Sequence, residues 1–297
     1  MIGDDPRRPV AFPGGSPANT AIALARLGTP VGFVGRFGND RFGDLLLANL
    51  AANGVDLTHA VEATEPASLA VVALGQDRGP AYGFHVSGTA DWAWRDGELP
   101  VLPADVQAVH TGSLAVALAP GADRLTRWYA DQRAHRVTSL DPNVRPALVG
   151  PRDPYLARLE TLVAASDIVK VSADDLAWTH PDADPAAVAL HWQRDLGPLL
   201  VVVTLGGDGA LAVHGGRVVH RPAAPLSIVD TVGAGDAFSG GLLHWLGERG
   251  LLRRDRLAAL DAAELHHAID YATTVAGLAC ARPGADPPHH TEVEVHP

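Results

Sequence analysis

The residues of this chain that are best suited to chemistry lie in one glycine-rich stretch, DTVGAGDAF, at positions 230–238. Residues 226–229 before it predict a short strand, and apolar residues at helical spacing follow it. The glycines are therefore expected where a strand turns into a helix, so that free backbone N–H groups and the positive end of the helix dipole meet at one place. Gly233 and Gly235 leave room there for a bulky anion to approach the backbone.

Asp236 stands beside this predicted anion hole, where its carboxylate would repel a bound phosphate. The arrangement makes chemical sense if the hole holds a phosphoryl group in transit and Asp236 accepts a proton from an attacking hydroxyl. The alternative is an ordinary helix N-terminus in which Asp236 is a capping residue or a first-turn acid.

Composition narrows the class of protein. The 297 residues are 47% apolar and 19% charged, which is typical of a folded globular chain. The formal net charge of −11 argues against nucleic-acid and acidic-membrane partners, although it does not exclude ATP. No apolar run approaches the length of a membrane span, and the lone Cys280 is expected to pack in a reducing environment. We therefore predict a cytoplasmic protein with no membrane partner.

A regular alternation of strands and helices begins near residue 105 and predicts a mainly parallel sheet with helices on both faces. The predicted strands are 106–110, 137–140, 168–171 and 200–204, and the helices between them are 122–134, 154–165 and 185–195. A hairpin is expected at 210–213 and 217–220, followed by helices at 236–248 and 262–281.

The N-terminal part predicts smaller elements around this sheet. Helices are expected at 21–27 and 42–53, a strand at 31–34 and a turn at 35–40. The strands 68–74 and 82–86 do not fit the alternation and predict a small β flap. We predict one α/β domain over residues 1–297, with a lid from about 65–90 and a contribution from 8–13.

Polar residues and glycines follow the predicted parallel strands where each strand ends. These residues are Asp141, Asn143, Arg145, Lys170, Ser172, Asp175, Thr204, Gly206 and Gly209. Because ligands of open parallel sheets bind beyond the carboxyl ends of the strands, these groups and the stretch 230–236 are expected to share one site. The site is not a P-loop, since Lys170 is the only lysine and no glycine precedes it.

With these residues in view, the chain resembles the ribokinase-like (PfkB) carbohydrate kinases from about Pro13 to Pro288. The motifs GGSPANTA at 14–21 and DTVGAGDAFSGGLL at 230–243 carry the resemblance. Within the family, DPNVRP at 141–146 and SGTADW at 87–92 are similar to bacterial fructokinases. The resemblance implies an ATP-dependent transfer to a primary hydroxyl of a sugar, with D-fructose as the favoured substrate.

The resemblance also implies roles for matched positions. Asp236 would be the base, and Gly233, Ala234 and Gly235 would form the anion hole. The positions that would contact the sugar are Gly14, Gly15, Asn19, Tyr82, Phe84, Asn143 and Arg145. The positions that would face ATP are Lys170, Ser172, Thr204, Gly206, Gly209, Gly233, Gly235, Ala276 and Gly284.

Two cations are implied as well. Asp175 occupies the acidic position associated with Mg²⁺, where the family usually has Glu, so that its metal contact would run through water. Asp230 and Val232, together with Gly284, resemble a potassium site. The simpler alternatives are a surface ion pair for Arg145, an exposed helix acid for Asp175, a plain turn for Gly14 and Gly15, and flap packing or a homodimer contact for Tyr82 and Phe84.

One feature departs from the family pattern. The family normally opens with a buried strand, which this chain lacks, and Asp4 and Asp5 are no convincing substitutes for the sugar-binding acid that follows it. We expect the loss of that strand to expose strand edges and leave an apolar groove. The corresponding hypothesis is a translation start upstream of Met1, which an in-frame stop directly before Met1 would refute. The rival functions are a 2-keto-3-deoxygluconate kinase and a non-catalytic sugar- or nucleotide-binding relative.

Overall fold

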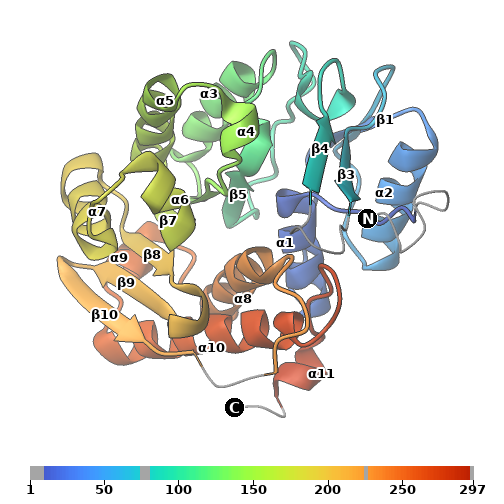
Figure 1. Ribbon diagram of the computed structural model, residues 1–297. Coiled ribbons are helices and arrows are strands. Elements are labelled where there is room, and N and C mark those ends of the chain that lie inside the picture. Colours follow the sequence, from blue (N-terminus) through green and yellow to red (C-terminus); the bar gives the residue numbers. More distant parts are fainter. Residues whose placement is uncertain (1–9, 74–80, 224–226, 295–297) are drawn as a thin grey trace.

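A six-stranded sheet forms the centre of the protein in a computed structural model (Figure 1). The structure describes residues 10–73, 81–223 and 227–294. The strand order is β10-β9-β8-β7-β6-β5, in which β5 to β8 are parallel and β9 and β10 are antiparallel. The bounds are β5 (Ala108–Gly112), β6 (Val137–Asp141), β7 (Ile168–Ser172), β8 (Leu200–Thr204), β9 (Ala210–His214) and β10 (Arg217–Arg221). The predicted mainly parallel sheet is confirmed.

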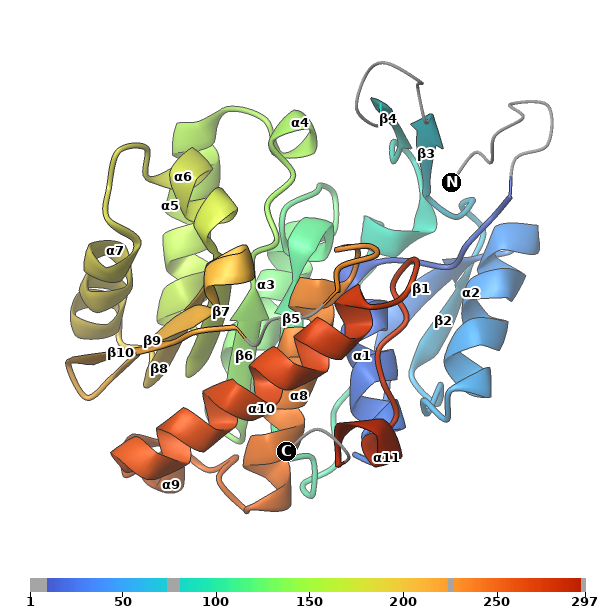
Figure 2. The same ribbon diagram turned by 60° about the horizontal axis from the view of Figure 1, so that its bottom comes forward.

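Helices cover both faces of the sheet, as the alternation predicted (Figure 2). One layer contains α3 (Ala122–Gln132), α5 (Arg152–Ala164), α6 (Ala173–Thr179) and α7 (Pro185–His191), and the other contains α1 (Ser16–Arg26), α8 (Ala234–Glu248) and α10 (Ala262–Cys280). The alternating side chains of β8 show why both faces of the sheet are covered. Val201 and Val203 pack in the core under the first layer of helices, and Leu200 and Val202 pack in the core under the second. A strand buried on both faces reads as a continuous apolar run.

Short helical segments complete the chain. They are α4 (Pro146–Val149), α9 (Arg254–Ala258), α11 (His290–Val293), η1 (Ala90–Trp92), η2 (Ser113–Val116), η3 (Trp192–Leu196) and η4 (Gly206–Asp208). In the described ranges, no helix is both long and apolar enough to cross a bilayer.

A second, two-stranded parallel sheet of β1 (Gly35–Gly38) and β2 (Ala60–Ala63) flanks α2 (Arg41–Ala52). The strand predicted at 31–34 is wrong, because the strand lies at 35–38, where a turn was expected. All four residues of β1 are buried, including Arg36, whose guanidinium pairs with Glu65 and Glu98. Partners so distant in sequence cannot be read from a local pattern. Helix α1 also begins earlier than predicted, at Ser16, because Pro17 is compatible with a first helical turn.

The predicted flap is present as the antiparallel pair β3 (Leu69–Ala73) and β4 (Ala81–His85) (Figure 1). Side chains of the main body hold its base. Asp40 Oδ2 accepts from Ala67 N at 2.9 Å, and Trp92 Nε1 donates to Val86 O at 2.8 Å. The predicted contribution of 8–13 is not seen as a strand, since 10–13 have no regular structure and 8–9 lie outside the described residues.

The expected apolar groove is present as a cavity of about 1150 Å³ between the two sheets, that is, between the six-stranded sheet and the β1–β2 sheet. Its lining includes Val34 and Gly35 from the segment of β1, Ala108 and Val109 from β5, and Leu24 from α1. Among the described residues, β5 pairs only with β6 and β1 only with β2, so each strand has an edge without a partner strand.

Candidate active site

The N-terminus of α8 is built around two glycines that no other residue could replace without a shift in structure. Gly233 has a left-handed φ of 79°, and a Cβ on it would lie 2.7 Å from the Cβ of Ala285. A Cβ on Gly235 would lie 2.6 Å from Lys170 Nζ. The strand predicted just before this stretch is not observed, because 227–229 form no strand and 226 lies outside the described residues. A loop therefore leads into α8.

The predicted anion hole has free donors at its helical end. Ala234 N donates to Thr231 O at 3.2 Å, so this group is already engaged in the turn. Within the described ranges, the N–H groups of Gly235 and Asp236 have no hydrogen-bond partner. Free N–H groups in the first turn of a helix are suited to binding an anion.

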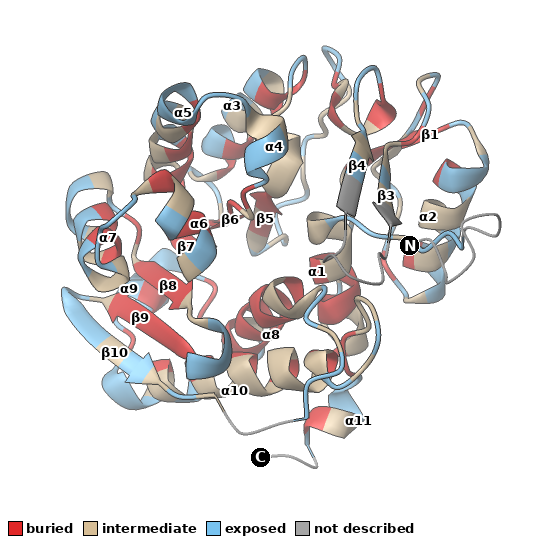
Figure 3. Cartoon of the chain, viewed as in Figure 1, coloured by how far each residue is buried: buried red, intermediate tan, exposed pale blue. Residues whose placement is uncertain are grey.

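Asp236 belongs to the first turn of α8, faces α1 and is buried, with 5% of its surface exposed. Ser16 Oγ donates to Asp236 Oδ1 at 2.6 Å, and Asn19 Nδ2 donates to Asp236 Oδ2 at 2.7 Å. Helix α8 lies between α1 and α10 and has most of its residues buried (Figure 3). The structure thus brings together the two motifs at 14–21 and 230–243.

Burial raises the pKa of Asp236 from 3.8 to about 6. The hydrogen bonds from Ser16 and Asn19 and the charge of Lys170 lower this pKa, whereas the charge of Asp141 raises it. A carboxyl group with a pKa near 6 is mostly ionised at neutral pH and is a better proton acceptor than an ordinary aspartate. The alternative of a capping residue is wrong, because Gly233 is the N-cap and no side-chain cap is made there. Asp236 does lie in the first helical turn, but it is buried against α1 and hydrogen-bonded from both sides, unlike an ordinary first-turn acid.

Lys170 lies beneath the hole as half of a buried ion pair. Its Nζ donates to Asp141 Oδ2 at 2.9 Å, and both side chains are almost fully buried. Burial alone would lower the pKa of Lys170, but the carboxylates of Asp141, Asp236 and Asp175 together outweigh it and the pKa is raised, so the amine is charged. Ser239 Oγ also approaches Asp141 Oδ2, at 3.5 Å. The pair places a positive charge directly against Gly235.

The loop after β6 is held by Asp175. Asp175 Oδ1 accepts from Val144 N at 2.8 Å and Oδ2 accepts from Ser172 N at 3.2 Å, while Ser172 Oγ caps α6. Asp175 is only 8% exposed, so the alternative of an exposed helix acid is wrong. Arg145 is exposed, and its Nη1 donates to Asn143 Oδ1 at 2.5 Å within the same loop. No surface ion pair of Arg145 is found in the described part of the chain.

The other residues predicted to face the nucleotide lie at or after the ends of β7 and β8 and near the C-terminal end of α10. Thr204 ends β8, and η4 follows it. Gly206 begins η4 and Gly209 comes directly after it, with positive φ of 59° and 92°. Asp230 Oδ1 accepts from Val232 N at 3.0 Å and its Oδ2 accepts from Gly284 N at 2.8 Å. The structure therefore brings together the three predicted positions of the potassium site. Ala276 lies in α10 and is partly buried.

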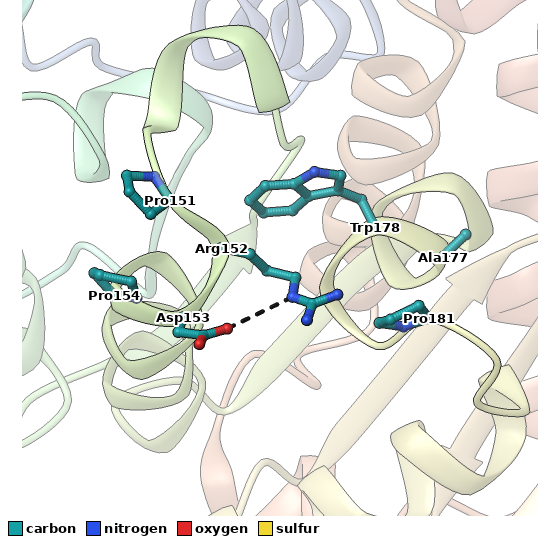
Figure 4. Close-up of a pocket in the computed structure, with 7 residues that line it drawn as sticks. All are labelled: Pro151, Arg152, Asp153, Pro154, Ala177, Trp178 and Pro181. Carbon is teal, nitrogen blue, oxygen red and sulfur yellow. Dashed lines mark ion pairs between the residues drawn. The ribbon is translucent and has the colours of Figure 1, made fainter.

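The lid residues are not brought to Asp236 by any described contact. Phe84, like Gly14 and Gly15, lines the groove between the two sheets. The side chain of Tyr82 lies outside the part that the structure describes. A separate hollow of about 470 Å³ between α5 and α6, lined by Trp178, Arg152 and prolines, contains none of the predicted site residues (Figure 4).

Sequence reasoning did not foresee the hydrogen bond from Ser16 to Asp236 or the ion pair of Asp141 with Lys170, although both residues stand in the motifs that it singled out. The ion pair could have been inferred from chemistry, since a buried lysine needs a counter-ion and Asp141 ends the neighbouring strand. Among the described residues no cluster of three or more His, Cys, Asp or Glu could hold a metal ion.

The pfkB family carbohydrate kinase model matches residues 4–292. The chain belongs to this family. It is 37% identical to a fructokinase of Rhizobium leguminosarum bv. trifolii over 87% of this chain and 79% of the relative. It is 35% identical to a fructokinase of Klebsiella pneumoniae over 96% of this chain and 94% of the relative.

Solved structures agree with this assignment. A fructokinase from Vibrio cholerae O395, in a form with bound fructose, ADP and calcium ion, superposes on the kinase with a TM-score of 0.85. The identity is 29%, and the match covers 99% of this chain and 94% of that one. A double mutant of the same fructokinase, with fructose, ADP and potassium ion, gives a TM-score of 0.84 at 28% identity over 97% of this chain and 92% of that one. The predicted ribokinase-like fold and kinase class are confirmed.

Proposed function

We propose that this kinase transfers the γ-phosphoryl group of ATP to the primary hydroxyl of D-fructose and forms fructose 6-phosphate. The observation that carries the proposal is the buried Asp236, which two side-chain donors hold next to the free N–H groups of a helix N-terminus. A proton acceptor beside an anion site is what phosphoryl transfer to an alcohol requires. The fructokinases among the similar proteins support fructose as the acceptor.

In the proposed reaction the sugar hydroxyl approaches Asp236, which takes its proton as the oxygen attacks phosphorus. The N–H of Gly235, the helix dipole and the charge of Lys170 would stabilise the negative charge of the transferred group. Asn19 and Gly15 would contact the sugar, and Asn143 and Arg145 would lie between sugar and phosphates. Burial of the base strengthens these interactions because water is excluded.

Mg²⁺ fits this site as a companion of the nucleotide. Both carboxylate oxygens of Asp175 accept backbone N–H groups, so this residue would reach the ion through water while phosphates supply the direct ligands. The ion would supply charge neutralisation on the phosphates. Asp230, Val232 and Gly284 would form the potassium site. An intracellular phosphoryl donor fits the predicted cytoplasmic location, and a homodimer through the lid stays a prediction.

The rival acceptor is an acid sugar such as 2-keto-3-deoxygluconate. The observation that favours it is the exposed guanidinium of Arg145, which could pair with a sugar carboxylate. A non-catalytic binding role is the second rival, and the buried, oriented Asp236 argues against it.

The test is ADP release from ATP and Mg²⁺ in the presence of D-fructose, with Asp236→Asn as the matched control. We expect turnover with fructose and a loss of at least about a hundredfold in the control, which keeps the shape but cannot accept the proton. Turnover with 2-keto-3-deoxygluconate in place of fructose would shift the assignment to the acid sugar. Stabilisation by ATP and sugar without any turnover would indicate the binding role.

A further inference from the structure

Ser16 makes a contact that the proposed reaction does not yet use. It is the first residue of α1, and its hydroxyl donates to Asp236 Oδ1 at 2.6 Å, 220 positions away in the sequence. This length is typical of a hydrogen bond from a hydroxyl to an ionised carboxylate, which is stronger than one between neutral groups.

The contact completes a two-sided hold on the carboxylate. Ser16 donates to Oδ1, Asn19 donates to Oδ2, and Thr20 Oγ1 donates to the backbone oxygen of Asp236 at 3.4 Å. All three donors come from one turn of α1, which packs directly on α8 where a Cβ at Gly240 would lie 2.6 Å from Ala23 Cβ. The carboxylate plane is therefore set by a rigid element, and both oxygens are best satisfied when the group carries no proton.

We propose that Ser16 is a positioning residue that keeps Asp236 ionised and oriented toward the acceptor hydroxyl. The inference rests on the proposed role of Asp236 as the base. It adds to the proposed mechanism a residue, Ser16, that contacts the base Asp236.

The contribution of Ser16 to the pKa of Asp236 can be separated from the contributions of the other groups around this carboxylate. Burial raises the pKa of Asp236, the donors Ser16 and Asn19 lower it, Asp141 from the end of β6 raises it, and Lys170 from β7 lowers it. Substitution of Ser16 leaves Asn19, Asp141 and Lys170 in place. Loss of the hydroxyl therefore raises the pKa of Asp236 further, and the base becomes protonated at a higher pH.

The first test compares wild type, Ser16→Ala and Ser16→Thr by kcat and KM for the sugar across the range of about pH 5 to pH 9. We expect the acidic limb of kcat/KM to move up by about one pH unit in Ser16→Ala. The variant would then lose several-fold in rate near neutrality and recover toward the wild-type rate in mild alkali, while Ser16→Thr keeps the wild-type profile. A raised KM with an unmoved acidic limb, or an equal loss at every pH, would overturn the proposal.

The second test needs no turnover. The unfolding free energy is measured for Ser16→Ala in the Asp236 background and in the Asp236→Asn background, at about pH 8 and about pH 5. We expect Ser16→Ala to cost most in the Asp236 background at the higher pH, where the carboxylate is ionised. Equal costs in both backgrounds at both pH values would overturn the inference. A wild-type protein without turnover would count against the proposed function alone, since this cycle still reports on the contact.

Discussion

At the scale of one residue, the buried charge of Asp236 lowers the free energy of unfolding of the protein. Its burial disfavours the charged form, and the hydrogen bonds from Ser16 and Asn19 recover only part of that cost, because the pKa still rises to about 6. A protein that needs a base at this position keeps a buried carboxylate where an amide would be more stable.

We therefore predict that Asp236→Asn is more stable than wild type at about pH 8, while it lacks activity. The pKa of Asp236 is about 6 in the folded protein and near 3.8 in the unfolded chain, so the folded state binds the proton first as the pH falls. Wild type thus gains stability between about pH 7 and pH 4, and the advantage of the variant shrinks over the same window. The expected gain at high pH is on the order of 1–3 kcal/mol.

Thermal or urea unfolding of both proteins at several pH values measures this difference. A variant that is less stable at high pH, or a difference that does not depend on pH, would contradict the argument that burial of the charge dominates.

At the scale of elements, the position of Asp236 depends on how closely α8 packs between α1 and α10. Gly240 faces Ala23 of α1, and Gly241 faces Val275 of α10, where a Cβ would lie 3.0 Å from the Val275 Cβ. Small residues at these positions let the helices approach closely. The same approach brings Ser16 and Asn19 within hydrogen-bond distance of Asp236.

Gly240→Ala is expected to push α1 away from α8 and to lower both stability and kcat. The added methyl would lie 2.6 Å from Ala23 Cβ and 3.4 Å from Leu24 N, and backbone cannot yield as easily as a side-chain end. We expect a loss of about 1–3 kcal/mol in unfolding free energy and at least about tenfold in kcat.

Gly247→Ala in the same helix is the matched control, because its methyl would meet only the end of the Leu252 side chain at 3.4 Å. Alanine is the better helix former, so this control should be neutral or slightly stabilising. Equal effects of the two substitutions in unfolding and steady-state kinetics would refute the packing argument.

The elements also show what a sequence can and cannot reveal. Strands β6, β7 and β8 were predicted within one residue, because their apolar runs are bounded by turn residues and both faces are covered. The strand at 35–38 was missed because its glycines and the following Asn39 and Asp40 are typical of a turn. The charge of Arg36 also argues against a buried strand until its pairing with Glu65 and Glu98 is known. In the site, Asp236 was visible from its motif, whereas the Asp141–Lys170 pair depends on strand register across the sheet.

At the scale of the whole molecule, the main unexplained surface is the groove between the two sheets. The described strands β1 and β5 each leave one edge without a partner, and the cavity of about 1150 Å³ beside them is lined mostly by apolar side chains. Large accessible apolar surfaces are uncommon in folded proteins and bind apolar molecules. The 297-residue chain should therefore carry a hydrophobic binding surface in its native state.

We predict that the dye ANS fluoresces strongly with the native 297-residue protein, well below its unfolding temperature. Ala108→Phe, which adds a ring to the wall of the groove, should lower the fluorescence because it fills part of the space. Near-UV circular dichroism of both proteins serves as the control, since a loosely packed state would also bind the dye but would lose this signal. A native spectrum without dye binding would mean that the two sheets close on one another in solution. Dye binding with a native spectrum, reduced by Ala108→Phe, would locate the exposed apolar surface at the unpaired edges of β1 and β5, where one additional strand could satisfy both.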